Sequence, residues 1–152
     1  MGMVYAELTL RNAYDVGSAS RGLIKEEEVR SAVVTALVDT GAKSMVISEE
    51  LREELGLGIK HLTEVELANE KTEVARETEL VEVQWKDRCY TGPAWVLSGW
   101  GEPLMGFLPL ESMDLMVDPV HQELVGIHGD KELGIAVGVR VAKKKPSTNS
   151  ND

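Results

Sequence analysis

The sequence has little of what disulfide-bonded, metal-binding or nucleic-acid-binding proteins need. Its single cysteine, Cys89, cannot form a bridge within the chain, and no Cys and His spacing of the zinc type is present. Lys and Arg number 16 against 26 Asp and Glu, and the formal net charge of −10 disfavours nucleic acid and anionic membranes as partners. No apolar run is long enough to span a bilayer, and the amino terminus lacks a basic segment followed by an apolar one. We therefore expect a soluble cytoplasmic protein with no metal and no cofactor.

The length of the chain suits one domain followed by a tail. With 152 residues, of which 43% are hydrophobic, it can form one domain with a real core but not two stable ones. Residues 143–152 combine three lysines with Pro, Ser, Thr and Asn, a composition typical of disordered segments. We predict a folded domain over residues 1–130 and a flexible tail over residues 131–152.

Apolar residues recur mostly at period two or in short continuous runs, which predicts a mainly β fold. The strands expected from this pattern cover residues 4–10, 28–38, 45–47, 61–68, 89–91, 94–97, 115–117 and 123–127, with a further stretch that ends at Trp85. Two short helices are expected. The first follows Ser48, which can cap it, and stops at Gly56, and a weaker one covers residues 108–113. The segment 12–25 is rich in Gly and Ser and is interpreted as a long loop.

The segment with the clearest chemical content joins two apolar strands through Asp39, Thr40, Gly41 and Ala42. Here a strand of the core delivers a carboxylate into a tight turn. An ionised Asp in such a place is costly unless it is hydrogen-bonded or shares a proton with another acid. Gly41 would allow backbone N–H groups to approach the carboxylate closely.

At this point the sequence resembles the retropepsin-like aspartic peptidases, above all the bacterial and archaeal ones. The chain reads Ala-Leu-Val-Asp-Thr-Gly-Ala over residues 36–42 and Met-Val-Ile-Ser over residues 45–48. A hairpin around residues 68–70 is similar to the family's flap, the hairpin that closes over bound peptide. Further on, Leu-Met-Gly at 104–106 and Leu-Met-Val-Asp-Pro at 115–119 match the pieces that flank a short helix.

The resemblance extends over about residues 27–127 and implies a single-lobe β-barrel with one or two short helices. It gives the catalytic role to Asp39. The residues that it implies as supports of the active site are Thr40, Gly41, Ala42 and Gly106. The flap residues that it implies as substrate-binding are Ala68, Asn69, Glu70 and Lys71.

The chemistry of such a peptidase explains why one chain is not enough. One carboxyl must donate a hydrogen bond to the scissile carbonyl while a neighbouring carboxylate takes a proton from the attacking water. Because the chain has one Asp-Thr-Gly, centred on Thr40, a symmetric homodimer must supply the second carboxyl. The sequence therefore predicts an aspartic endopeptidase that is active as a homodimer on peptide or protein substrates.

Other interpretations remain open at this stage. The triplet could be an ordinary junction between a strand and a turn, because Asp and Gly both favour turns. The fold could also serve a dimeric peptide-binding or assembly module without turnover. A thiol nucleophile built on Cys89 with one of the three histidines is a third class, although no family signature surrounds Cys89. The three tryptophans could line a cleft, but large aromatic side chains are more often part of a core or an interface.

Overall fold

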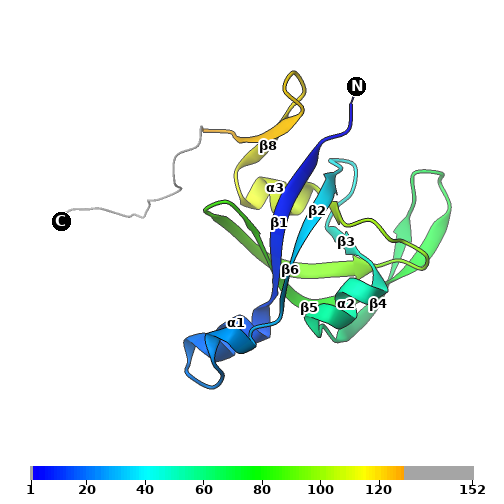
Figure 1. The fold of residues 1–152 in the computed structure, drawn as a ribbon. Helices are drawn as coiled ribbons and strands as arrows, with labels where there is room; N and C mark the ends of the chain where they lie inside the picture. Colours follow the sequence, from blue (N-terminus) through cyan, green and yellow to red (C-terminus); the bar gives the residue numbers. More distant parts are fainter. Residues whose placement is uncertain (1, 129–152) are drawn as a thin grey trace, which may run out of the picture.

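A computed structural model describes residues 2–128 of the chain (Figure 1). The tail predicted for residues 131–152 lies outside the described residues. Within the described range, none of the helices has the length and apolar character that crossing a membrane would require.

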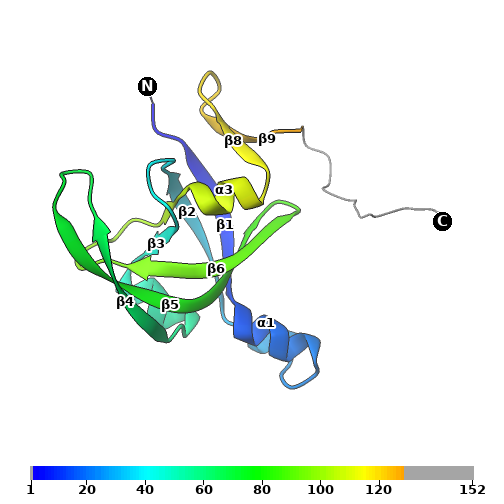
Figure 2. The same ribbon diagram turned by 180° about the vertical axis from the view of Figure 1, so that it is seen from behind.

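Seven strands form one sheet in the order β1-β2-β7-β3-β6-β5-β4. Residues 9–12 of β1 also pair with residues 81–84 of β5, so that six of the strands close into a ring and β4 remains at the edge. A separate two-stranded sheet, β8–β9, lies at the end of the molecule where the chain enters β1 (Figures 1 and 2). The strands are β1 Tyr5–Asn12, β2 Ser31–Val38, β3 Met45–Ile47, β4 Ile59–Glu66, β5 Thr72–Trp85, β6 Arg88–Val96, β7 Leu104–Met105, β8 Leu115–Asp118 and β9 Glu123–Gly126.

The predicted mainly β fold is confirmed, but the helices are more numerous than expected. Helix α2 (Glu49–Leu55) begins after the predicted cap, with the Ser48 hydroxyl accepting a hydrogen bond from Leu51 N–H, and it ends at Gly56 in the left-handed region. Helix α3 (Phe107–Ser112) lies within one residue of its predicted place. A third helix, α1 (Ala13–Ser20), and a short 3₁₀ turn, η1 (Glu26–Glu28), were not expected.

Helix α1 shows that the loop predicted for residues 12–25 was wrong. The buried Asn12 side chain caps α1 by accepting a hydrogen bond from Asp15 N–H at 3.1 Å. The same side chain donates to the carbonyl of Leu55 at 2.9 Å, at the end of α2. Asp15 is in turn held by both a backbone N–H and the guanidinium of Arg30, which lowers the pKa of the Asp15 carboxyl. These tertiary contacts stabilise a helix that its Gly and Ser content disfavours.

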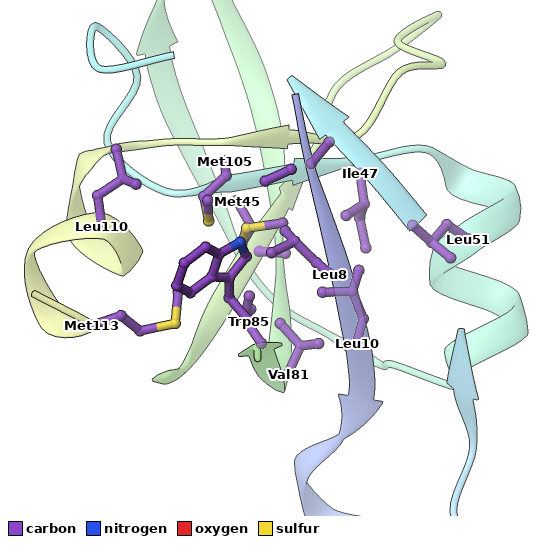
Figure 3. Packing of buried hydrophobic residues seen from close by; sticks show 14 of the residues in the cluster. Leu8, Leu10, Met45, Ile47, Leu51, Val81, Trp85, Met105, Leu110 and Met113 are labelled. Carbon is purple, nitrogen blue, oxygen red and sulfur yellow. The ribbon is translucent and has the colours of Figure 1, made fainter. Parts of the chain in front are cut away.

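The main core fills the ring of strands and is built around Trp85 (Figure 3). The indole lies among methionine side chains, including Met45, Met105 and Met113, which adapt to its irregular outline. Leu8, Leu10 and Val81 complete the packing from β1 and β5. The prediction that the tryptophans belong to a core is thus confirmed for Trp85.

Arg88 is a buried charged residue that joins the end of α3 to strand β6. Its guanidinium donates hydrogen bonds to the carbonyls of Met113 and Asp114 at 2.9 and 3.0 Å. The Met113 carbonyl follows the last turn of α3, and the Asp114 carbonyl also accepts a hydrogen bond from Ile127 N–H at 2.8 Å. The contact therefore fixes the helix that follows Gly106 against the ring.

Strands β4 and β5 form a long hairpin that projects from the ring (Figures 1 and 2). Its tip contains no glycine, and Glu70 there adopts a φ of 67°. The turn is closed by hydrogen bonds from Leu67 N–H to the carbonyl of Lys71 and from Glu70 N–H to the carbonyl of Leu67. A non-glycine residue in this left-handed region is strained by contact between its Cβ and the backbone.

We predict that Glu70→Gly raises the free energy of unfolding by about 0.5–1 kcal/mol, because glycine adopts this conformation without that contact. Urea denaturation of the purified protein measures the change. Lys71→Gly is the matched control, since Lys71 is not at positive φ and the same substitution there should lower stability. An equal change in the same direction for both variants would contradict the explanation.

Candidate active site

Asp39 lies directly after β2, where the strand leaves the core. Its side chain is half-buried, and the Thr40 and Gly41 that follow are exposed, so that the turn faces away from the core. The Asp39 Oδ1 accepts a hydrogen bond from Gly41 N–H at 2.9 Å. Within residues 2–128 this is the one hydrogen bond that the carboxyl group makes. The turn therefore presents a carboxyl group that one backbone donor orients and that remains accessible from outside.

Gly106 lies beneath this turn and packs against its backbone. A Cβ at Gly106 would come within 2.5 Å of the carbonyl oxygen of Ala42 and 2.6 Å of that of Ser44. No side chain fits there without moving the main chain of the turn. The short β7 therefore approaches the segment 39–44 as closely as backbone atoms allow.

Hydrogen bonds on both sides of Gly106 lock the turn to β7 and α3. Asp39 N–H donates to the carbonyl of Met105 at 2.9 Å, and Gly106 N–H donates to that of Ser44 at 3.0 Å. Phe107 N–H then donates to the carbonyl of Ala42 at 2.8 Å. The position of the Asp39 backbone is thus fixed by a strand and a helix that come more than sixty positions later in the chain.

A second group of apolar residues connects the turn to the β4–β5 hairpin. We call it the hairpin cluster; it consists of Val46, Val65, Ala75, Leu97 and Leu104, with Ala42, Leu67 and Trp95 packed against it. Ala42 belongs to the turn, and Leu67 is the first residue of the hairpin tip. The hairpin therefore rests on the same apolar surface that carries the Asp39 turn.

The structure brings together Asp39, Gly41, Ala42 and Gly106. Thr40 is exposed on the turn. The four predicted tip residues, 68–71, are exposed, and it is Leu67 that anchors the tip to the hairpin cluster. Sequence reasoning missed Leu67, and it considered Trp95 only together with the other tryptophans, as a residue of a cleft or a core. The signal for Leu67 was its place as the last large apolar residue before a polar turn.

The environment of Cys89 does not favour a thiol nucleophile. Its side chain lies on β6 and is exposed. Although the residue is exposed as a whole, neighbouring atoms partly desolvate the thiol; this desolvation, followed by the nearby Glu82 carboxylate, raises the pKa of the Cys89 thiol, which reduces the fraction of reactive thiolate. Among residues 2–128 no three His, Cys, Asp or Glu side chains gather as metal ligands do.

Comparison with known families identifies the chain. The sequence model of the family described as Aspartyl protease matches residues 26–120. The chain belongs to this aspartyl protease family. The matched segment contains the Asp39 turn, the β4–β5 hairpin and Gly106. Membership of the family supports a peptidase-type role. No protein with a curated description matches the chain significantly.

Solved structures of retropepsin-like proteases share the fold. The protease of EIAV in complex with the inhibitor HBY-793 aligns with a TM-score of 0.51 at 15% identity, over 72% of this chain and 86% of that one. The retroviral protease-like domain of Ddi1 from Leishmania major aligns with a TM-score of 0.51 at 16% identity, over 82% of this chain and 84% of that one. The fold of this aspartyl protease family member is therefore retropepsin-like, as the sequence predicted.

We predict that Gly106→Ala lowers the free energy of unfolding by about 1–3 kcal/mol, because the added methyl group must displace the backbone of the Asp39 turn. Thermal and urea denaturation measure the loss. Gly101→Ala is the matched control: a Cβ there meets nothing within 4 Å, and we expect a change of no more than about 0.5 kcal/mol. Equal stability of the two variants would show that the close packing under the turn is not what constrains position 106.

Proposed function

We propose that this protein is an aspartic endopeptidase that acts as a homodimer through a pair of Asp39 carboxyls. The observation that carries the proposal is the Asp39 turn itself. A carboxyl group stands at the end of a core strand, is oriented by Gly41 N–H at 2.9 Å, and is braced from below by Gly106. The peptidase domain would comprise about residues 1–130, and the single cysteine suits a reducing cytoplasm.

The reaction needs two carboxyl groups with different tasks. In the pair that we propose, one carboxylate takes a proton from a water molecule, and the water oxygen attacks the carbonyl carbon of the peptide bond. The other, protonated carboxyl donates a hydrogen bond to the carbonyl oxygen as negative charge develops there. The proton taken from water then passes to the leaving nitrogen as the C–N bond breaks. Two carboxyls about 3 Å apart cannot both be ionised, so they would titrate as a pair.

The exposure of the turn supports the pairing of two subunits. Thr40 and Gly41 are exposed and the Asp39 carboxyl is accessible, so that a second copy can approach the turn along a two-fold axis. A two-fold interface uses the same patch on both subunits, and it would place each Asp39 opposite the other. In this assembly Thr40 would make contacts across the axis, and Gly41 would leave room for the carboxyls.

The β4–β5 hairpin would cover the bound peptide. Its inner residues Val65 and Ala75 and the tip anchor Leu67 already lie on the apolar surface next to Ala42. A peptide that displaces these contacts would lie between the hairpin and the Asp39 turn. In this role the tip residues Ala68 to Lys71 would contact substrate.

We predict that Asp39→Asn lowers the rate of peptide cleavage on the order of 10³-fold or more, because an amide neither takes a proton from water nor shares one with the partner carboxyl. Denatured casein is the substrate, tested from acidic to neutral pH. Asp87→Asn, in the exposed turn between β5 and β6, is the control for the loss of an aspartate elsewhere and should keep full activity. Equal cleavage by wild type and Asp39→Asn would eliminate the mechanism. A folded dimer that binds peptide without cleaving it would instead point to a binding module.

Mixing the two forms tests the pairing of subunits. When equal amounts of wild-type and Asp39→Asn protein exchange subunits, half of the wild-type subunits sit in mixed dimers with one carboxylate. We expect the activity per wild-type subunit to fall to about one half of that of the unmixed wild-type protein. Activity per subunit should also fall on dilution, as sedimentation shows dimers dissociating. If the activity per wild-type subunit changed neither on mixing nor on dilution, a single subunit would be sufficient for cleavage.

A further inference from the structure

A groove with a volume of about 590 Å³ lies between the first half of β1 and strand β9. Residues 5–7 line it from β1, and residues 123–125 line it from β9. Gln84, Trp85 and Lys86, where β5 turns into β6, also line it. Since β1 and β9 belong to different sheets, the groove lies between the closed ring and the small β8–β9 sheet.

Strand β1 leaves one of its edges unpaired along this groove. Residues 5–11 pair with β2 on one side, whereas on the other side pairing with β5 begins only at Thr9. Val38 N–H donates to the carbonyl of Val4, so the alternation of an antiparallel ladder directs the main-chain groups of Tyr5 and Glu7 to the other edge. Among residues 2–128, no strand pairs with that edge between Tyr5 and Leu8. The groove is therefore lined by main-chain donors and acceptors that suit an added strand.

Both walls of the groove are held in place. Ala6 of β1 and Leu124 of β9 point into the same main core. Gly2 packs so closely on Gln122, in the turn between β8 and β9, that a Cβ there would overlap the side-chain amide of Gln122. These contacts keep β9 beside the start of β1 (Figures 1 and 2). The groove is therefore formed before anything binds in it.

The sequence that follows the described residues contains a segment with the pattern of a strand. Apolar residues stand at every second position, with Gly, Ala or Arg between them: Leu133, Ile135, Val137, Val139 and Val141. A period of two made mostly of β-branched residues predicts a strand with one apolar face and one face of mainly small side chains. The composition that indicates a flexible tail is that of residues 143–152, and it does not extend to this segment.

The chain leaves the described range close to the groove. Val125 lines the groove, and His128, three positions later, is fixed by a contact of its Nδ1 with the Asp114 Oδ2 at 2.7 Å. Leu133 is five positions after His128, and an extended chain of that length spans at most about 17 Å. A connection this short keeps the segment at an effective concentration of roughly millimolar or more near the groove. The segment of the same chain therefore reaches the groove ahead of other peptides.

The charges of the segment and the groove are complementary. Residues 131–145 contain five Lys and Arg side chains and one acidic side chain. The groove is lined by Glu7 and Glu123 together with Lys86. A basic segment is thus attracted to a groove with more acidic than basic side chains, in a chain with a formal net charge of −10.

We propose that residues 133–141 bind in this groove of their own chain as an added β-strand, hydrogen-bonded to the main chain of Tyr5 and Glu7. Their apolar side chains would cover the apolar parts of Tyr5, Trp85 and Leu124 that line the groove. The small side chains on the other face of the segment would allow it to lie close to the opposite wall. This strand would join the β8–β9 sheet to the ring. The proposal goes beyond peptide cleavage, since it holds whether or not Asp39 is catalytic.

Amide hydrogen exchange of the full-length protein tests the added strand. In the wild type we expect protection of the Tyr5 and Glu7 amides and of alternate amides within residues 133–141. In the double variant Ile135→Asp/Val137→Asp, exchange at Tyr5 and Glu7 should become roughly tenfold faster or more, because two charges prevent burial of the apolar face. Ser147→Asp/Ser150→Asp is the matched control. It adds the same charge outside the segment and should leave this exchange unchanged.

The measurement is made at protein concentrations at which sedimentation shows single subunits. A difference between the two double variants that persists there supports a strand from the same chain. A difference that appears only in dimers would mean that the strand comes from a second copy, and it would overturn the proposal. Equal exchange at Tyr5 and Glu7 in both double variants at every concentration would also overturn it.

Discussion

The contact on which the rest of the structure depends is the approach of Gly106 to the backbone of the Asp39 turn. Residues 39–44 and 104–107 exchange hydrogen bonds at a separation that leaves no space for a side chain. Through this contact β7 fills the place between β2 and β3 and completes the ring. The direction of the carboxyl group, the start of α3 and the closure of the sheet therefore share one physical cause.

The molecule combines a rigid ring with a hairpin that is held by few contacts. The ring is filled by the main core and carries the turn, while the outer part of the hairpin, beyond Arg76, packs on the rest of the molecule through the hairpin cluster. Positional accuracy is needed where a carboxyl must meet its reaction partner. Freedom to move is needed where a long chain must enter and leave. In the proposed peptidase, different parts of the chain that meet at Ala42 would serve these two requirements.

Much of this arrangement could be predicted from local patterns. The apolar run before Asp39 forms a strand, Ser48 caps α2, and Gly56 ends it. Each of these features is local, and each was predicted correctly from the sequence. Helix α1 was missed because Gly17 and the serines disfavour a helix locally, while its stabilising partners, the Asn12 contact with α2 and Arg30, are distant in sequence. The place at Arg76 where the hairpin separates from β6 was missed for a similar reason. It is defined by where two ladders end, which depends on three strands at once.

The closure of the ring by β1 and β5 has a consequence for how the chain reaches its native state. Thr9 pairs with Gln84, so that β1 is synthesised well before the strand that closes the ring against it. Contacts between such distant positions cost more chain entropy to form and slow folding. Until β5 arrives, one edge of β1 stays unpaired and open to aggregation.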